Sequence, residues 1–359
     1  MQTYVEDAEN RLMIKPVQFA IVGCGMISSF HVQAINSQES ARLAGVYDHL
    51  PAMAAQKAEE YQTTCYESYE SMLKDPSIDV ICVCTPSGLH AQQAIQAIQA
   101  GKHVLIEKPL ALNLKDSDQI SLLARQNSVL VGVISQLRCS KAVSQIKAAI
   151  DNNRLGRIVS ADLYMKYYRS QSYYDQSPWR GTWAMDGGGA LMNQGIHGID
   201  LLRYLAGPLE SICARAKTLV RHIEVEDTLS AVVTFRSGAL GVIQATTSVY
   251  PGFPRRLEIH GEIGSIILEE DTIVLWAIAG EPERFCPEQN TAQKSYRNPT
   301  DIGTAGHMAQ YTNFIQAVQG KASLLVDDQA GRQALEIIVK AYESSEKGQT
   351  LYFSPESPG

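Results

Sequence analysis

The chain has 359 residues, of which 45% are hydrophobic and 19% are charged, as in ordinary globular proteins. This length is sufficient for two domains with a large buried core. The net charge of −7 argues against a nucleic-acid partner, and no apolar run approaches the roughly 20 residues that span a membrane. The seven cysteines lack the spacing of a disulfide framework, which indicates a reducing, cytoplasmic setting.

The first informative stretch is residues 17–25, a short apolar run that ends in Gly23 and Gly25 and precedes a helical pattern. A strand, a tight glycine turn and a helix start together form a binding site for a diphosphate. Gly23 permits the turn, Gly25 lets the backbone approach a ligand closely, and the helix start offers free N–H groups. We therefore place Gly23, Gly25, Met26 and Ile27 at a dinucleotide cofactor, although ordinary strand-to-helix corners also look like this.

Asp48 follows the second predicted strand, residues 42–47, and lies 23 residues after Gly25. A carboxylate at about this distance accepts hydrogen bonds from the adenosine ribose hydroxyls in dinucleotide-binding folds. The alternative is that it caps the helix that begins near Pro51. A 2′-phosphate 4 Å from Asp48 would be repelled by about 4 kcal/mol per charge pair, so the sequence favours NAD over NADP.

The apolar run at residues 80–84 predicts a strand that is buried on both faces, and it ends at Thr85 and Pro86. Ligands of parallel sheets bind at the carboxyl ends of the strands. We therefore expect Thr85 and Pro86 to border the nicotinamide half of the cofactor, unless they form only a simple turn. His90, near the start of the next predicted helix (89–100), is added to the cofactor-binding residues.

A further strand, residues 103–106, leads into Glu107, Lys108 and Pro109. Proline has no N–H and restricts the residue before it to an extended backbone, so Lys108 is held facing the cleft. A cationic amine there can hydrogen-bond a substrate hydroxyl and stabilise negative charge on its oxygen. We assign Glu107 and Lys108 to the cofactor site. The alternative is a solvated lysine that pairs with Glu107.

Alternating strands and helices up to residue 133 predict a parallel sheet with right-handed crossovers. From residue 157 the pattern changes to strands, and many of their apolar residues recur with a period of two. We predict strands over residues 157–168, 228–236, 239–248, 256–260 and 264–276. They should form a mainly antiparallel sheet with one face covered by helices, which leaves the other face available to a partner subunit.

Residues 186–205 combine a glycine loop with a helical pattern. Asn193 and His197 are four residues apart, so they project from one face of the helix. We expect Asp200 to hydrogen-bond the imidazole and to fix its tautomer. The alternative is that His197 is a core histidine with no role in chemistry.

Aromatic and basic residues alternate upstream of this loop, at Tyr168, Arg169, Trp179 and Arg180. Aromatic rings stack on the C–H faces of sugars, and arginine can grip a carboxylate or a phosphate. We predict that these four residues contact the substrate, although a loop packed on the sheet would have the same composition.

Residues 22–27, 84–86, 107–109 and 188–200 together resemble the motifs of the Gfo/Idh/MocA (glucose-fructose oxidoreductase / inositol dehydrogenase) family, and the resemblance extends over residues 16–350. It implies an α/β Rossmann domain with a parallel sheet, followed by an α+β domain with a large open antiparallel sheet. It also implies a homodimer or homotetramer built on that sheet. The reaction implied is hydride exchange between NAD(P) and a sugar, cyclitol or sugar nucleotide.

In this family pattern, Lys108 contacts the reacting hydroxyl and His197 is the general acid/base. Many members have Asp at the position of Asn193, whose amide cannot relay a proton but can orient a hydroxyl. We therefore expect an NAD-dependent dehydrogenase with Lys108, His197 and Asn193 at its catalytic centre and no metal ion. Two alternatives remain open: an NAD-dependent glycoside hydrolase that uses a transient oxidation, and a non-catalytic NAD-sensing binding protein.

The expected domain organisation follows from these patterns. Residues 1–15 carry acidic side chains and no apolar core, so we expect a leader and not a signal peptide. The NAD-binding domain should span residues 16–138, the substrate and oligomerisation domain residues 139–350, and a tail residues 351–359.

Overall fold

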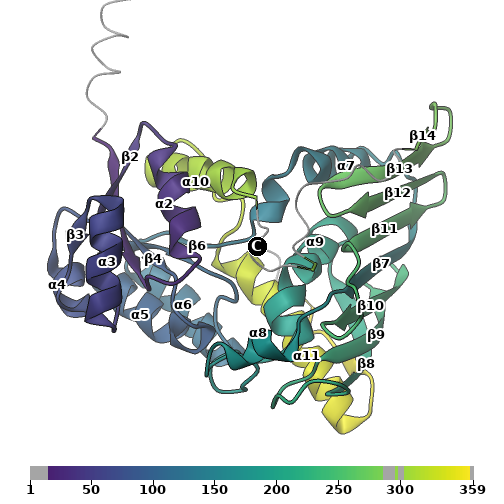
Figure 1. Cartoon of the computed structure of the whole chain (residues 1–359). Coiled ribbons are helices and arrows are strands. Elements are labelled where there is room, and N and C mark those ends of the chain that lie inside the picture. Colours follow the sequence, from purple (N-terminus) through teal and green to yellow (C-terminus); the bar gives the residue numbers. More distant parts are fainter. Residues whose placement is uncertain (1–14, 286–295, 298–302, 356–359) are drawn as a thin grey trace, which may run out of the picture.

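The structure of the chain is a computed structural model that describes residues 15–285, 296–297 and 303–355; the predicted leader up to residue 14 and the end of the predicted tail lie outside these ranges. Two sheets dominate it (Figure 1). The strands of the first sheet are β1 (Val17–Val22), β2 (Ala41–Tyr47), β3 (Thr64–Cys65), β4 (Val80–Val83), β5 (His103–Ile106) and β6 (Val131–Val133). The helices that connect them are α2 (Ser28–Asn36), α3 (Pro51–Tyr61), α4 (Tyr69–Lys74), α5 (His90–Gln99) and α6 (Leu114–Gln126).

The first sheet has the strand order β3-β2-β1-β4-β5-β6, and every neighbouring pair is parallel. All four residues of β4 are buried, as the continuous apolar run predicted. The strand order reverses between β1 and β4, and a crevice opens at the carboxyl ends of the strands at such a switch point. The predicted Rossmann sheet is confirmed, and its glycine turn lies at this crevice.

The second sheet contains more strands than the sequence predicted. They are β7 (Ile158–Lys166), β8 (Leu209–Lys217), β9 (Thr228–Phe235), β10 (Leu240–Thr246), β11 (Arg256–Gly261), β12 (Gly264–Glu269), β13 (Thr272–Ile278), β14 (Arg284–Phe285) and β15 (Leu351–Tyr352). The order is β14-β13-β12-β11-β7-β10-β9-β8-β15. The prediction of a mainly antiparallel sheet is confirmed, since only β7 and β10 pair in parallel among these strands.

The second sheet differs from the predicted strands in two places. The strand predicted over residues 264–276 is a hairpin of β12 and β13 that turns at Glu270, whose φ is +47°. Neither glycine nor proline marks this turn, so the apolar pattern runs through it. Residues 351–352, predicted as part of a tail, form β15 and pair with β8.

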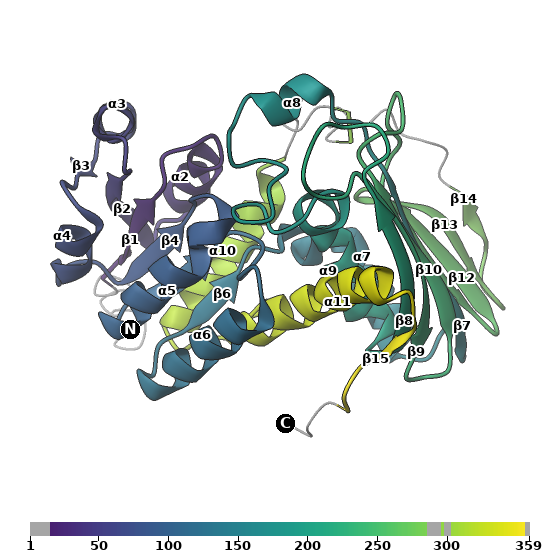
Figure 2. The ribbon, with the colours of Figure 1, turned by 90° about the horizontal axis from the view of Figure 1, so that it is seen from below.

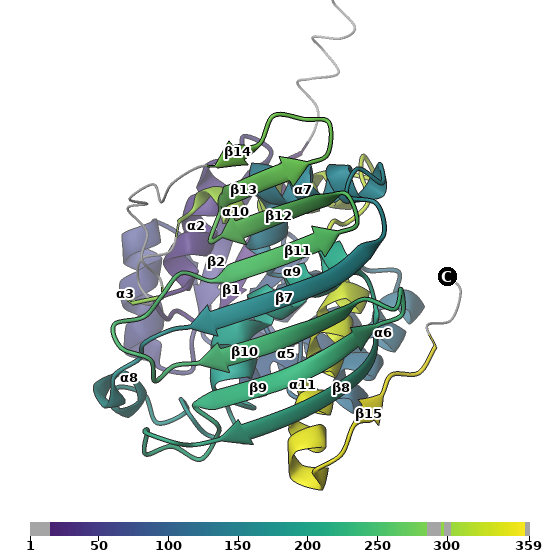
Figure 3. The ribbon, with the colours of Figure 1, turned by 90° about the vertical axis from the view of Figure 1, so that its right-hand side faces the viewer.

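One face of the second sheet is covered and the other is open. Along β9 the residues Leu229, Val233 and Phe235 are buried, while Val232, which points the other way, is 58% exposed. Helices α9 (Ile196–Ala206) and α11 (Asp328–Lys347) lie on the inner face (Figure 2). None of the described helices covers the outer face, which Figure 3 views directly.

Helix α10 (Ala305–Val318) follows strand β14 of the second sheet in sequence but packs against α2 of the first domain. Its Tyr311 and Phe314 are buried, and both rings contact Phe19 of β1. Helix α11 likewise contacts α6 and β6. The C-terminal helices therefore tie the two sheets together and fix the cleft between them.

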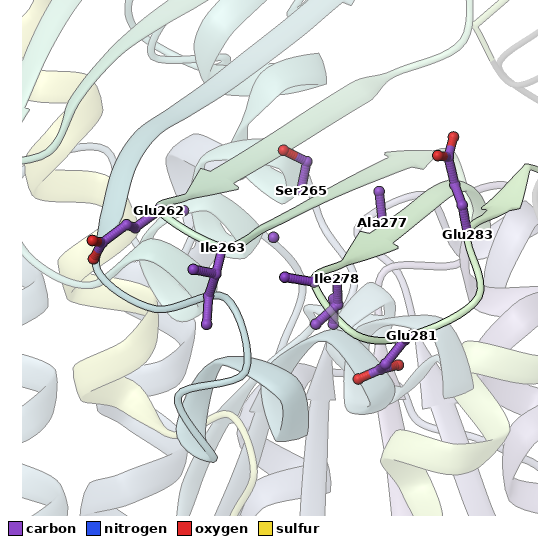
Figure 4. A pocket seen from close by; sticks show the side chains of 10 residues that line it. Glu262, Ile263, Ser265, Ala277, Ile278, Glu281 and Glu283 are labelled. Atoms are coloured by element: carbon purple, nitrogen blue, oxygen red, sulfur yellow. The ribbon is translucent and has the colours of Figure 1, made fainter.

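A shallow depression of about 390 Å³ lies at one end of the second sheet, where β11 turns into β12 and β13 leads to β14 (Figure 4). Glu262, Glu281 and Glu283 line it. Glu281 forms an ion pair with Arg154. The depression shares no lining residue with the large cleft described below.

Candidate active site

A cleft of about 1680 Å³ lies between the two domains. One wall consists of the loops that follow β1, β2, β4 and β5, and the other is built from residues of the second domain. Every residue that the sequence assigned to the cofactor lines this cleft: Gly23, Gly25, Met26, Ile27, Asp48, Thr85, Pro86, His90, Glu107 and Lys108. A cleft of this size can hold a dinucleotide and a second molecule side by side.

The glycine turn has the geometry that a diphosphate site needs. Gly23 has a φ of +96°, and a Cβ there would lie 2.7 Å from the backbone of Cys84. At Gly25 an added Cβ would meet no atom within 4 Å, so the space beside this backbone is open. Ile27 immediately precedes α2, and the N-terminus of a helix carries partial positive charge that suits a diphosphate. The turn therefore fits the diphosphate of a dinucleotide.

Asp48 lies next to the same turn. Its carboxylate accepts a 2.8 Å hydrogen bond from the N–H of Cys24 and a 2.9 Å bond from the N–H of Leu50. His49 forms an exposed ion pair with it at 3.0 Å. The side chain therefore braces the glycine turn and presents negative charge to the cleft, which suits ribose hydroxyls and disfavours a 2′-phosphate.

His90 lines the cofactor wall and connects two of its loops. It is 1% exposed, and its ring nitrogens lie 2.7 Å from the carbonyl oxygen of Pro109 and 2.8 Å from that of Thr85. Thr85 in turn donates from its hydroxyl to Gln93 at 2.6 Å. These contacts tie together the two loops that carry Thr85 and Lys108.

Lys108 lines the cleft, and its amine is bonded to Asn193, so it is not the solvated lysine paired with Glu107 that the alternative proposed. Its amine donates to the backbone carbonyl of Asn193 at 2.7 Å and lies 3.4 Å from the Asn193 side-chain oxygen. Burial lowers the pKa of Lys108, although Glu107 and Asp186 oppose this. Glu107 accepts a 3.0 Å hydrogen bond from His31. Burial alone would raise the pKa of Glu107, but His31 and the neighbouring positive charges lower it to about 2.

Asn193 belongs to a π-helical turn, η3 (Ala190–Gly195), which leads directly into α9 and His197. The amide of Asn193 donates to the carboxylate of Asp186. Burial raises the pKa of Asp186 to about 6, while hydrogen bonds from Gly181 and Asn193 oppose this rise. π-Helical turns occur often at functional sites because they displace one residue from the regular helix.

His197 lines the cleft together with Lys108 and Asn193. Burial lowers the pKa of His197 to about 3, and the positive charge of Lys108 contributes to this shift. The imidazole is therefore neutral at pH 7 and has the capacity to accept a proton. The structure thus brings together the three residues that the sequence placed at the catalytic centre.

The predicted role of Asp200 is wrong. Its carboxylate accepts hydrogen bonds from Arg138, at 2.7 Å from Nε and 2.6 Å from Nη2, and from the hydroxyl of Ser135. Arg138 is 7% exposed, and a buried guanidinium requires a charged partner. Asp200 therefore neutralises Arg138 and does not orient the His197 ring.

Three of the four predicted substrate residues, Arg169, Trp179 and Arg180, line the cleft. Arg169 is 3% exposed and donates to the side chain of Gln194 at 2.7 Å. Arg180 donates to the carbonyl of Tyr173 at 3.0 Å and lies 4.4 Å from the centre of that ring. The guanidinium groups are thus held in place on the wall of the cleft that the second domain forms.

Tyr168 does not line the cleft, which corrects the prediction for this residue. It forms a bridge with Ser248, and its ring packs edge-on against Tyr250 at 5.3 Å. Side chains alternate in an extended chain, so Tyr167 and Arg169 face the cleft while Tyr168 faces away.

Sequence reasoning gave no role to three cleft residues of the second domain: Gln194, Arg255 and Glu270. Tyr167 and Tyr173, which belong to the same aromatic and basic stretch as Arg169 and Arg180, also line the cleft. Arg255 is 4% exposed and donates to the carbonyl of Glu270 at 2.8 Å. The Glu270 carboxylate accepts from the Arg255 N–H at 2.7 Å. The sequence feature that could have indicated Arg255 and Glu270 is that each belongs to two consecutive residues of like charge, at 255–256 and 270–271, beside apolar strand patterns.

Within the described ranges, no side chains form a cluster of three or more that could hold a metal ion. None of the helices in that part of the chain is long and apolar enough to cross a membrane.

Comparison with known proteins identifies the family. Residues 17–135 match "Oxidoreductase family, NAD-binding Rossmann fold", and residues 143–267 match "GFO/IDH/MocA C-terminal domain". The myo-inositol 2-dehydrogenase of Thermotoga maritima is 25% identical over 345 residues, which cover 93% of this chain and 98% of that protein.

Among solved structures, the WlbA dehydrogenase of Bordetella pertussis, in complex with NADH and UDP-GlcNAcA, is 33% identical with a TM-score of 0.86. The match covers 95% of this chain and 99% of WlbA. A levoglucosan dehydrogenase in complex with NADH and levoglucosan is 24% identical with a TM-score of 0.84. The match covers 94% of this chain and 99% of that one, and at this identity it supports the fold alone. Because the two domain matches span most of the chain in the same order, this chain belongs to the Gfo/Idh/MocA family of NAD-binding oxidoreductases.

Proposed function

We propose that this protein is an NAD-dependent dehydrogenase that oxidises a secondary hydroxyl of a sugar nucleotide, or reduces the corresponding ketone. The observation that carries the proposal is the meeting of Lys108, Asn193 and His197 in the cleft that also contains the glycine turn and Asp48. Residues from both domains converge there, as a hydride transfer between two bound molecules requires.

In the proposed mechanism, bound NAD supplies the hydride acceptor at its nicotinamide ring. Lys108 donates a hydrogen bond to the reacting hydroxyl oxygen and stabilises the negative charge that develops on it. His197 accepts the hydroxyl proton: its imidazole is neutral at pH 7, and its pKa of about 3 makes it a weak base until negative charge develops on the substrate oxygen. Negative charge that develops on the substrate oxygen between Lys108 and His197 would offset the repulsion between the Lys108 ammonium and the protonated His197, which raises the pKa of His197 as the reaction proceeds.

Two observations favour a sugar nucleotide over a small polyol. Arg169 and Arg180 line the cleft, and guanidinium groups bind phosphates and carboxylates with two hydrogen bonds. The similar WlbA dehydrogenase was solved with NADH and UDP-GlcNAcA. A neutral cyclitol carries neither a phosphate nor a carboxylate for these guanidinium groups to bind.

The test is a screen of UDP-sugars, UDP-linked uronates, aldoses, polyols and aryl glycosides for NADH formation, with NAD and NADP in parallel. We expect NADH formation with at least one UDP-sugar and a preference for NAD. Lys108→Met and His197→Gln should each lower turnover by about 10²-fold or more.

The other outcomes separate the competing functions. Release of an aglycone from an aryl glycoside without net NADH would favour the hydrolase. Tight NADH binding with no turnover on any compound would favour the sensor. Turnover that survives in both variants would contradict the roles proposed for Lys108 and His197.

We further propose that the outer face of the second sheet mediates homodimer or homotetramer formation in the cytoplasm. Val232 of β9 and Leu240 of β10 are apolar and are 58% and 57% exposed on this face. The described cysteines are free, which suits a reducing compartment. Light scattering of wild type and Val232→Glu tests the assembly, because a buried glutamate would weaken it.

A further inference from the structure

The first amides of the segment that carries Asn193 and His197 are all bonded to two residues from distant parts of the chain. The first four N–H groups of a helix normally lack partners inside it. Here the N–H groups of Gly189 and Leu191 each donate to the carboxylate of Glu226 at 2.8 Å. The N–H of Ala190 donates to the backbone carbonyl of Glu226 at 3.0 Å. The N–H of Met192 donates to the Tyr342 hydroxyl at 3.2 Å. The Tyr342 hydroxyl in turn donates to Glu226 at 2.9 Å.

The glycine loop allows this close contact. A Cβ at Gly189 would lie 1.8 Å from the carbonyl oxygen of Glu226, and one at Gly188 would lie 2.3 Å from the Tyr342 hydroxyl. Larger residues would push the loop away from both partners. The two glycines therefore have a packing role, separate from the cofactor turn at Gly23.

Glu226 is 4% exposed, and every group that contacts its carboxylate is a hydrogen-bond donor. Negative charge at the start of a helix is favourable because the helix dipole places partial positive charge there. Burial raises the pKa of Glu226 to about 7, and the amides of Leu191 and Gly189 oppose this rise. The contacts therefore suit the ionised carboxylate.

The same segment holds the amine of Lys108. Asn193 donates its backbone N–H to the carbonyl of Gly189 at 3.0 Å, and its own carbonyl accepts the 2.7 Å hydrogen bond from Lys108. A movement of the start of the turn would thus move the group that orients Lys108. The turn ends at Gly195, and His197 is the second residue of α9, which begins at Ile196.

We propose that Glu226 and Tyr342 are positioning residues that fix the π-helical turn and, through the Asn193 carbonyl, hold Lys108 against His197 for hydride transfer. This inference rests on the roles proposed above for Lys108 and His197. Neither Glu226 nor Tyr342 lines the cleft, so they act through the turn and do not contact substrate or cofactor.

The experiment uses the full chain with NAD and the UDP-sugar that the screen selects, at about pH 8.5, where Glu226 is ionised. Glu226→Gln places an amide NH₂ against a backbone N–H, and Tyr342→Phe removes the partner of Met192. Both variants should lower the single-turnover rate of hydride transfer by about 10- to 100-fold, the effect of a small displacement at a catalytic centre. NADH affinity, measured by fluorescence titration, should change by less than about threefold, because the cofactor wall is untouched.

Ser344→Ala is the matched control. Ser344 lies on α11, as Tyr342 does, and its buried hydroxyl joins the helix to β8 through the N–H of Ala214. This variant should lose thermal stability and keep its hydride-transfer rate. If Glu226→Gln does not fold, Tyr342→Phe alone carries the test, since it removes one of the four outside contacts.

A double-mutant cycle separates positioning from a general loss of stability. In the Lys108→Met background, Glu226→Gln should cost less than about threefold in rate, because the group that it positions is gone. Independent, multiplicative effects would overturn the inference, and so would wild-type rates in Glu226→Gln and Tyr342→Phe. If Lys108→Met and His197→Gln also kept wild-type rates, the proposed function itself would fail.

Discussion

The side-chain amine of Lys108 donates a 2.7 Å hydrogen bond to the backbone carbonyl of Asn193, 85 residues later in the chain. Lys108 follows β5 of the Rossmann sheet, whereas Asn193 lies in a turn of the second domain. The bond therefore joins the two domains at the point where cofactor and substrate should meet. Asn193 lies within the π-helical turn, a kind of turn that occurs often at functional sites.

The first prediction concerns Lys108. Lys108→Met keeps most of the side-chain volume and removes the charge and the donor, so we expect kcat to fall about 10²- to 10³-fold. The Kd for NADH should change little, since the glycine turn and Asp48 are intact. Steady-state kinetics and NADH fluorescence titration measure the two quantities.

Lys102→Met is the matched control for this prediction. Lys102 is 8% exposed and donates to the carbonyls of Asp75 and Ile78, away from the cleft. Its loss should lower the melting temperature and leave kcat unchanged. Equal losses of kcat in both variants would mean that Lys108 acts only through stability.

The second prediction is a pH dependence of stability. The pKa of His197 is lowered from 6.5 to about 3 in the folded chain, so between these pH values the unfolded chain binds a proton that the folded chain does not. The contribution of the neutral, buried His197 to the free energy of unfolding is therefore fully present above pH 6.5 and is lost as the pH falls toward 3. Between pH 7 and pH 5, wild type should lose about 2 kcal/mol more unfolding free energy than His197→Gln.

Urea unfolding of both proteins at the two pH values measures this difference. Other titrating groups, such as Asp186 and Glu226, are present in both proteins, and their contributions cancel in the comparison. An identical pH dependence in wild type and His197→Gln would show that His197 keeps an ordinary pKa in the folded protein.

The Rossmann half could be predicted well from sequence because its signals are contiguous. The glycine turn, Asp48, the Thr85–Pro86 turn and the segment around Lys108 each follow one strand directly, and the parallel sheet aligns the strand ends at one edge. Once the strands are placed, these side chains converge without further information. All the residues that the sequence assigned to the cofactor accordingly line the cleft.

The second domain was harder to predict because single-residue register decides which side chains face the cleft. Tyr167 and Tyr168 are adjacent in sequence, yet only Tyr167 lines the cleft. Asp200 has the right spacing to reach His197, but a buried arginine from a distant segment binds it. Glu226 gave no signal, since its partners are backbone amides that sequence patterns do not mark.

The third prediction concerns cofactor choice. Asp48→Asn keeps the size of the side chain and removes the charge that repels a 2′-phosphate. We expect the ratio of kcat/KM for NADP to that for NAD to rise by about tenfold or more, well within the roughly 4 kcal/mol available from one charge pair. Initial rates with both cofactors measure the ratio. An unchanged ratio would place the discrimination elsewhere in the cleft.

The fourth prediction concerns Arg180, which lines the cleft and lies over the Tyr173 ring. Its Nε has no hydrogen-bond partner among the described residues, so a ligand oxygen has a donor to bind there. Arg180→Met should raise KM for the sugar nucleotide about 10- to 100-fold, because a hydrogen bond to a charged group contributes roughly 1.5–3 kcal/mol. Since this contact is equal in ground and transition states, kcat should stay within about threefold of wild type.

Arg236→Met provides the comparison for Arg180. Arg236 is exposed and donates to the carbonyl of Phe353 at 2.9 Å, and it does not line the cleft. If KM rises for Arg180→Met alone, and only with substrates that carry a phosphate or carboxylate, the guanidinium of Arg180 binds that anion. A parallel rise for a neutral sugar would instead assign Arg180 to the shape of the pocket, because the stacked Tyr173 ring would lose its support.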